Sequence, residues 1–261
     1  MSKMSKKERE VLIKNLIRDP IPLYGRGFPL IFFWSPKSGC TSLVKWFLFQ
    51  NGLLQKAIDY DPWVHKYRAE VFQKQNNYTT ELTDQLLNDK NVTYKLVRNP
   101  YKRAVSSYLS TVTNENLKNK VFPGINNGFS FKQFLFKVKD IGVSSELIDR
   151  HIALQYVEGE ECIIKNYLHL ENFNNEIRMI ENKYNLLASP IQNISKSPHH
   201  MAQNMTDKGK GSFAEVKLTL ETAVGSLPTY ESFYDGETID LVKELFKKDF
   251  ISFGYNPTNL K

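Results

Sequence analysis

The chain has 261 residues, of which 41% are hydrophobic and 24% are charged, the balance of an ordinary soluble globular protein. Its formal net charge of +7 suits an anionic ligand. The basic residues are scattered and form no long run, zinc-finger or RNA-binding signature, which argues against a nucleic-acid partner.

The cysteines and the apolar stretches restrict the class of protein further. Two cysteines, Cys40 and Cys162, are too few for a disulfide framework or a metal cluster, and we expect both to be packing residues. No apolar stretch approaches the roughly 20 residues that span a bilayer, and the N-terminal residues lack a signal-peptide core. These features predict a cytoplasmic protein without an integral membrane segment.

The first predicted elements are a helix, a strand and a second helix. Apolar residues at helical spacing predict a helix over 5–18, within an N-terminal extension of residues 1–25. The apolar run 28–34 has the length of a buried strand. The next segment predicts a helix that begins at Cys40 or Thr41 and ends around Asn51.

This alternation of strand and helix recurs along the chain. The further elements predicted are strands over 92–100 and 161–171, helices over 101–112, 129–138, 144–156, 172–184 and 237–255, and a mobile loop over 189–212. Such alternation favours an α/β fold, here a P-loop-like three-layer α/β/α arrangement with a central, mainly parallel sheet. We expect one domain over residues 1–261.

The turn between the first predicted strand and its helix has the composition of an anion site. It reads Pro-Lys-Ser-Gly-Cys-Thr-Ser from residue 36 to 42. A helix that begins here presents unpaired N–H groups and the positive end of its dipole, which attract phosphate. Gly39 allows close approach of the backbone, and Lys37 adds a full positive charge. A helix with ordinary side-chain caps would explain Ser38 and Thr41, but not Lys37.

The turn departs from the common nucleotide-binding loop G-x-x-x-x-G-K-[ST]. Lys37 lies two residues before Gly39 rather than after it, and the first glycine of that pattern is absent. This departure argues against a kinase that uses ATP or GTP.

The second strand–helix junction, "VRNPYKRAVSSY", predicts another anion site. Arg98 follows the strand, and Ser106 comes eight residues later, about two turns along the helix. Pro100 suits the first turn of that helix, where its missing N–H costs little. A guanidinium can grip an oxyanion with two parallel hydrogen bonds. Two anion sites at neighbouring strand ends favour one ligand with two anionic ends.

Together, "SPKSGCTSLVKWF" and "VRNPYKRAVSSY" resemble the sulfotransferases that use 3′-phosphoadenosine-5′-phosphosulfate (PAPS). The resemblance is greatest to the Golgi-type carbohydrate sulfotransferases of the chondroitin and dermatan kind, with motifs of the form P-K-x-G-[CS]-T and V-R-x-P-x-x-R-x-x-S-x-Y. Weaker similarities follow in the family's order at 64–72, 149–155, 170–177 and 245–255. The resemblance therefore covers residues 28–255.

The resemblance implies a role for each matching residue. It implies that the 5′-phosphosulfate is bound by Lys37, Ser38, Gly39, Cys40, Thr41 and Ser42, and the 3′-phosphate by Arg98 and Ser106. It implies that PAPS becomes adenosine 3′,5′-bisphosphate (PAP) without a metal, while a hydroxyl, on a glycan or small sugar, accepts the sulfuryl group. Lys37 is the candidate for stabilising the leaving oxygen.

The acceptor hydroxyl needs a base, and a histidine is suited to this role. His65 is the first candidate because the similar enzymes place a catalytic base between the two anion motifs; the alternative is a polar histidine on a helix surface. His151 is the second candidate, as base or acceptor contact, and Asp149 and Glu171 are alternatives. His169 is expected to be structural, and His199 and His200 lie in the predicted loop.

Two further features leave alternatives open. The loop 189–212, with Lys196, Lys208 and Lys210, either covers the donor or is a solvated loop. Arg103 matches the second arginine of the family pattern, and either contacts the ligand or supports the helix.

Three functions are weighed on these observations. The leading one is a PAPS-dependent sulfotransferase acting on a carbohydrate. The others are a P-loop-related kinase of a small metabolite, and a non-catalytic module that binds anionic ligands.

Overall fold

A sheet of three parallel strands lies in the first part of this computed structural model, which describes residues 4–195, 205, 213–223 and 225–260. The strands are β1 (Leu30–Trp34), β2 (Val92–Val97) and β3 (Asn166–His169), in the order β1-β2-β3. The register pairs Trp34 with Leu96, so β1 and β2 end side by side. The prediction of an α/β fold with a parallel sheet flanked by helices is confirmed.

The described residues divide into two compact units. The first comprises 4–97 and 157–195, and the second comprises 98–156, 205, 213–223 and 225–260. The chain passes from the first to the second directly after β2 and returns before β3. The prediction of a single domain over 1–261 stays a prediction.

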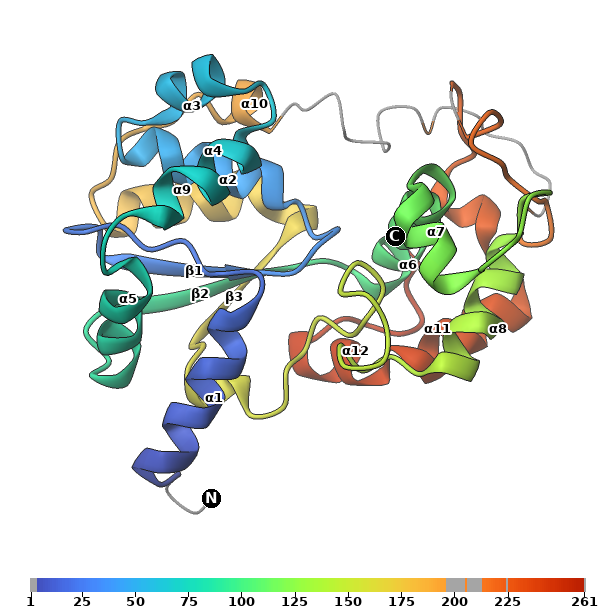
Figure 1. Ribbon diagram of the computed structural model, residues 1–261, viewed down its shortest axis with the longest axis horizontal. Coiled ribbons are helices and arrows are strands. Elements are labelled where there is room, and N and C mark those ends of the chain that lie inside the picture. The colour runs from blue at the N-terminus through green and yellow to red at the C-terminus, as the bar shows by residue number, and fades with distance from the viewer. Residues whose placement is uncertain (1–3, 196–204, 206–212, 224, 261) are drawn as a thin grey trace. The chain divides into compact units, whose positions relative to one another are not determined.

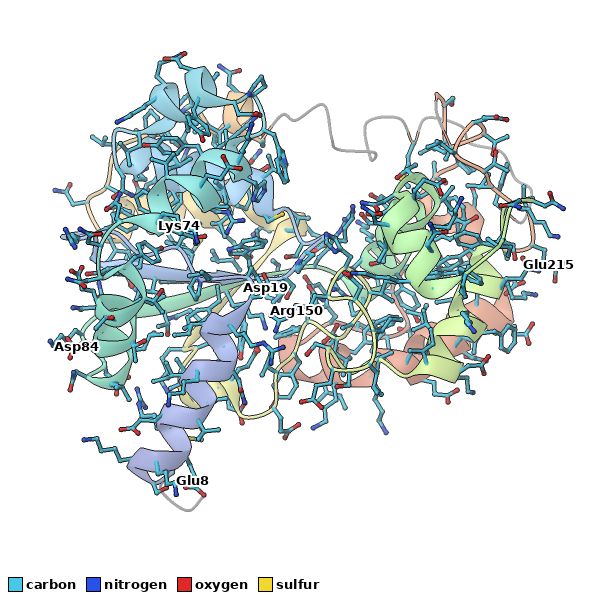
Figure 2. The ribbon with its side chains drawn as sticks, in the orientation of Figure 1. Glu8, Asp19, Lys74, Asp84, Arg150 and Glu215 are labelled. Atoms are coloured by element: carbon cyan, nitrogen blue, oxygen red, sulfur yellow. The ribbon has the colours of Figure 1, made fainter. Side chains whose placement is uncertain are left out.

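The first unit surrounds the sheet with helices. These are α1 (Lys6–Arg18), α2 (Cys40–Gln50), α3 (Leu54–Tyr60), α4 (Val64–Glu70), α5 (Tyr78–Leu87), α9 (Phe173–Lys183) and α10 (Ile191–Ile194), with short 3₁₀ turns η1 (Phe72–Lys74), η2 (Glu160–Cys162) and η3 (Leu170–Asn172). In Figure 1, α2 and α9 lie above the sheet and α1 lies below it. Glu8, labelled in Figure 2, lies near the start of α1, where it forms a capping box with Ser5.

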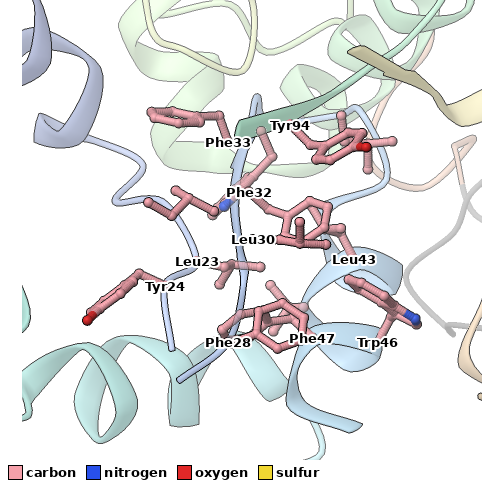
Figure 3. Packing of buried hydrophobic residues seen from close by; sticks show 14 of the residues in the cluster. Leu23, Tyr24, Phe28, Leu30, Phe32, Phe33, Leu43, Trp46, Phe47 and Tyr94 are labelled. Atoms are coloured by element: carbon pink, nitrogen blue, oxygen red, sulfur yellow. The ribbon is translucent and has the colours of Figure 1, made fainter. Parts of the chain in front are cut away.

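The core of the first unit explains why the loop after β1 is held firmly. All five residues of β1 are buried, as expected for a parallel strand covered on both faces. Leu43, Trp46 and Phe47 of α2 lie around Phe28 and Leu30 in Figure 3. The α2 helix is therefore packed on the strand that precedes it, and the turn between them is anchored at both ends.

The second unit is helical. Its helices are α6 (Pro100–Thr113), α7 (Glu115–Val121), α8 (Phe131–Ile141), α11 (Gly236–Leu245) and α12 (Lys247–Phe253), with the 3₁₀ turn η5 (Tyr230–Phe233). They enclose a second hydrophobic core centred on aromatic residues, among them Tyr108, Phe131 and Phe233. Tyr108 and Phe131 each make an edge-to-face contact with Phe233 at a centroid distance of 5.9 Å, and their own rings are tilted toward one another at 5.5 Å.

The strands and helices around the two predicted anion sites agree with the predictions, and three other segments differ. Residues 144–156 form turns rather than a helix. The predicted helix 237–255 is two helices that meet at Phe246, and the strand predicted over 161–171 is confined to Asn166–His169. Helices α3, α4, α5 and α7 were not predicted.

Residues 144–156 form single backbone turns, but no continuous helix, because side chains of α6 bind several of their carbonyls. The Arg103 guanidinium donates to the carbonyls of Ala153 and Arg150 at 2.7 and 3.0 Å. The Ser107 hydroxyl donates to the carbonyl of His151 at 2.5 Å. Side-chain donors that bind these carbonyls compete with the i to i−4 ladder of a helix.

Within the described residues, no helix is both long and apolar enough to cross a membrane.

Candidate functional site

The loop from Ser35 to Gly39 joins the buried end of β1 to the start of α2. The Ser38 side chain is fully buried and its hydroxyl is used inside the loop. It donates to the carbonyl of Ser35 at 2.5 Å and lies 3.3 Å from the carbonyl oxygen of Leu96 on β2. Ser38 therefore shapes the loop and ties it to the neighbouring strand, and its hydroxyl faces the protein.

The first turn of α2 has no side-chain cap. Its N-cap residue is Gly39, which has no side chain, and no side-chain cap hydrogen bond is formed. By contrast, α6 is capped by Asn99 and α8 by Ser130. The start of the helix agrees with the prediction, but Ser38 and Thr41 are not its caps. N–H groups without a side-chain acceptor, at the positive end of a helix, favour an anionic ligand.

Glycine is favoured at position 39 for two reasons. Its φ of 88° lies in the left-handed region, and an added Cβ would overlap Cδ1 of Leu170. Gly52 also has a positive φ, of 68°, but a Cβ there would meet nothing within 4 Å. A side chain would strain the backbone at either glycine, but it would also overlap a neighbour only at Gly39. Comparing the two positions therefore separates the two effects.

Gly39→Ala is expected to destabilise the protein more than Gly52→Ala. The backbone strain costs about 1–2 kcal/mol at either site, and overlap with Leu170 adds about 1–3 kcal/mol at Gly39. Chemical denaturation of both variants measures the difference. Equal losses in the free energy of unfolding would contradict close packing of the loop against Leu170.

Lys37 also has a positive φ, of 69°. A residue with a side chain is uncommon in this conformation, and glycine would adopt it with less strain. A lysine at such a position indicates that the side chain has a purpose other than folding.

His65 lies beside the start of α2. Its Nε2 is 3.3 Å from Thr41 Oγ1, and only 6% of the residue is exposed. Its ring lies between two tryptophans, with centroid distances of 5.7 Å to Trp34 and 5.6 Å to Trp63. The alternative of a solvated histidine on a helix surface is therefore wrong, because α4 buries this side chain against the loop.

Arg68, one helical turn after His65, was not among the predicted site residues. Its guanidinium lies 5.1 Å from the Trp34 ring and donates to Gln73 at 2.8 Å. It has no carboxylate partner within the described residues. Burial lowers the pKa of this arginine. In the sequence, only the weak family similarity over 64–72 marks Arg68.

Arg68 also affects the pKa of Cys40 in the loop. Burial raises the pKa of the Cys40 thiol, while Lys37 and then Arg68 lower it. Two buried donors beside the loop, Nε1 of Trp34 and Nε of Arg68, have no hydrogen-bond partner in the described part of the chain. A desolvated cation and unsatisfied donors favour binding of an anion here.

The last residue of the predicted loop site, Ser42, is 3% exposed. Its hydroxyl donates to the carbonyl of Ser195 at 3.4 Å. Ser195 is the last residue of the described range 4–195. Ser42 thus joins α2 to the segment after α10.

Arg98 begins the second unit directly after β2. Its guanidinium donates from Nη2 to the Tyr230 hydroxyl at 2.7 Å and lies 5.5 Å from the centre of that ring. Its backbone N–H and carbonyl both bond to the side-chain amide of Gln155. The residue is half-buried. The backbone and the guanidinium of Arg98 are therefore both held by neighbours within its own unit.

Ser106 and Arg103 lie on α6 and have different surroundings. Ser106 is half-buried, and among the described residues its hydroxyl has no side-chain or backbone partner. Arg103 is 1% exposed and donates to backbone carbonyls, and burial lowers its pKa to about 10 although Asp249 opposes this shift. Arg103 therefore supports the fold of residues 150–153, the second of its two predicted alternatives.

His151 forms a pair with Asp149 in the second unit. The ring Nδ1 lies 2.8 Å from Asp149 Oδ1, and the histidine side chain is 48% exposed. Burial acts to raise the pKa of Asp149, but hydrogen bonds from the His151 backbone and ring outweigh it and lower this pKa to about 2. An ionised carboxylate at Nδ1 leaves Nε2 as the basic nitrogen. His151 is thus also equipped to accept a proton.

The remaining predicted residues add little to the site. His169 ends β3, and its ring Nδ1 lies 3.5 Å from Glu176, as expected for a structural histidine. The start of the predicted loop 189–212 contains the short helix α10. His199, His200, Lys196, Lys208 and Lys210 lie outside the described residues. In the described ranges, no group of three or more His, Cys, Asp and Glu side chains could hold a metal ion.

A family model described as the sulfotransferase family matches residues 28–256. The match includes all three strands, the loop with Lys37 and the segment with Arg98. No curated protein matches the chain. No solved structure matches it either.

Proposed function

The chain belongs to the sulfotransferase family, and on this basis we propose that it moves a sulfuryl group from PAPS to a hydroxyl of a carbohydrate. Membership identifies the protein as a transferase of sulfuryl groups. The donor nucleotide and the class of acceptor are the parts that we propose.

We assign the 5′-phosphosulfate of the donor to Lys37, Ser38, Gly39, Cys40, Thr41 and Ser42, and the 3′-phosphate to Arg98 and Ser106. In the loop, the ligand would meet backbone N–H groups, the Thr41 hydroxyl and the Lys37 ammonium, while Ser38 contributes by shaping the turn. Arg68 supplies a second cation on the same unit.

The observation that carries this proposal is the start of α2. It lacks a side-chain cap, follows a buried strand, and has a lysine held at a strained φ in the preceding turn. A helix with ordinary caps would need none of these features. An anion of high charge density accounts for the missing cap, because it supplies acceptors to the first turn, and for the lysine, because it attracts a positive charge.

The proposed step is an in-line transfer in which one S–O bond forms and another breaks. The acceptor oxygen attacks sulfur and loses its proton to His65 Nε2. The bond from sulfur to the 5′-phosphate oxygen breaks, and that oxygen leaves with the bonding electron pair. Lys37 stabilises the charge that develops on it. His65 is the first candidate for the base because it contacts Thr41 of the same loop, and His151 is the second.

The acceptor proposal is supported by Trp63. This residue is 52% exposed, although its ring lies 5.6 Å from the ring of the buried His65. Its backbone N–H donates to Asp61 at 2.8 Å, which holds the start of α4 in place. An exposed, firmly held aromatic ring next to a base is suited to the apolar face of a sugar ring. The resemblance to the carbohydrate sulfotransferases points to the same class of acceptor.

The proposal is tested by thermal shift followed by turnover. PAP and PAPS, without magnesium, are expected to raise the melting temperature, and Mg-ATP is not. A ligand at 100 times its Kd stabilises the native state by about 2.7 kcal/mol, which is readily measured. Transfer of radiolabelled sulfate from PAPS to a panel of glycans then identifies the acceptor.

Two results would contradict this function. Stabilisation by Mg-ATP and not by PAP would favour the kinase alternative. Stabilisation by PAP with no transfer to any hydroxyl acceptor would favour the non-catalytic module.

A further inference from the structure

The backbone of Arg98 is clamped by one buried side chain. The amide oxygen of Gln155 accepts from the Arg98 N–H at 2.9 Å, and the amide nitrogen donates to the Arg98 carbonyl at 2.9 Å. Gln155 is 1% exposed. Because both bonds go to the main chain of one residue, they fix its position and its orientation together.

Asp249 of α12 holds Gln155 in turn. This fully buried carboxylate accepts from the Gln155 backbone N–H at 3.0 and 3.1 Å and from its amide nitrogen at 3.3 Å. A carboxylate accepts and does not donate when ionised, so the amide must present its NH₂ to Asp249. The same rotamer presents the amide oxygen to the Arg98 N–H. Asp249 thereby selects the only orientation of the amide that satisfies Arg98.

The guanidinium of Arg98 is held by Tyr230. The hydroxyl accepts from Nη2 at 2.7 Å, and the ring lies 5.5 Å from the guanidinium carbon. A guanidinium has five N–H donors in a planar fork, and this contact uses one of them. Tyr230 thus restricts the rotamer of the side chain.

We propose that Gln155, Asp249 and Tyr230 are positioning residues that preorganise Arg98 for the 3′-phosphate of the donor. The inference rests on the proposed function, since it assumes that Arg98 binds that phosphate. A free arginine side chain loses much rotamer entropy when it grips a ligand. A clamp that orders the arginine beforehand removes that cost from binding.

The test compares two nucleotides that differ only in the 3′-phosphate, PAP and adenosine 5′-monophosphate (AMP). The ratio of their Kd values, measured by titration calorimetry, reports the gain from the 3′-phosphate. Gln155→Met keeps a side chain of similar length but loses both bonds to Arg98. This variant is expected to raise the Kd of PAP about tenfold and to leave the Kd of AMP unchanged.

Gln133→Met is the matched control. Gln133 lies in the same unit, and its amide oxygen accepts from the Ser130 N–H at 3.0 Å in the capping box of α8. Its replacement removes a structural side-chain hydrogen bond that does not involve Arg98 and is expected to leave the PAP-to-AMP ratio unchanged. A loss that came from lower stability alone would affect PAP and AMP equally.

Two further variants keep the inference testable if Gln155→Met does not fold. Tyr230→Phe keeps the ring and loses the hydroxyl. It is expected to raise the Kd of PAP about threefold and to leave the Kd of AMP unchanged. The double variant Arg98→Met, Gln155→Met is expected to bind PAP no more weakly than Arg98→Met alone, because a residue that acts through Arg98 has nothing left to position.

The outcomes separate this inference from the proposed function. A wild-type protein that binds PAP and AMP equally would overturn both. A wild-type protein that prefers PAP, with Gln155→Met and Tyr230→Phe keeping the full preference, would overturn the positioning role alone.

Discussion

Lys37→Ala is expected to leave a folded protein whose turnover is lower by about 10²–10³. The lysine lies in the turn between β1 and the uncapped start of α2, where the leaving oxygen of the donor is proposed to bind. Charge builds on that oxygen only as the S–O bond breaks. The ammonium therefore stabilises the transition state more than the bound donor, and kcat should fall more than the affinity for PAPS.

The conformation of Lys37 allows activity to be separated from folding. Alanine at a φ of 69° carries the same backbone strain as lysine, so Lys37→Ala adds none. Lys37→Gly relieves the strain but increases the freedom of the unfolded chain, so its free energy of unfolding should stay within about 1 kcal/mol of wild type. Both variants are expected to be equally inactive.

Lys56→Ala is the matched control for charge. Lys56 lies on α3 of the same unit and is exposed. Its replacement lowers the net charge by one, as Lys37→Ala does, and should leave turnover unchanged. Steady-state kinetics with PAPS compare the variants. Full turnover by Lys37→Ala would remove this lysine from the mechanism.

His65→Gln is expected to lower kcat by about 10²–10⁴, the usual contribution of a general base. Glutamine can keep a hydrogen bond to the Thr41 hydroxyl, 3.3 Å from Nε2 of the histidine, but cannot accept a proton at neutral pH. The substitution thus removes the proposed chemistry while keeping a polar group against the loop. His65→Ala removes both.

The comparison of the two variants separates a base from a structural residue. If His65 is the base, glutamine and alanine are equally inactive in single-turnover assays. If glutamine is active and alanine is not, His65 only supports Thr41.

His151→Gln tests the second candidate in the same assay. This histidine is half exposed and paired with Asp149. We expect its replacement to change kcat by less than about tenfold, because the His65 ring contacts Thr41 of the loop that we propose to bind the sulfuryl group. A loss that matches or exceeds the effect of His65→Gln would transfer the role of base to His151.

The sequence by itself determined the elements that carry the two motifs. The apolar run of β1, the turn with Gly39 and the periodic helix α2 are local patterns, and each agrees with the structure. Pro100 in the first turn of α6 is another local signal that the structure confirms. Such features are predictable because a turn or a helix start depends on residues within a few positions of it.

Only the tertiary structure decided which side chains surround those motifs. His65 lies against Thr41 and Arg68 beside Trp34 because α4 packs near the start of α2, and no periodicity of the sequence encodes that choice. Residues 144–156 have a helical pattern, yet Arg103 and Ser107 bind their carbonyls. The physical reason is the same in each case: propensity and spacing act locally, whereas a buried polar group bonds to whichever partner the packing brings within reach.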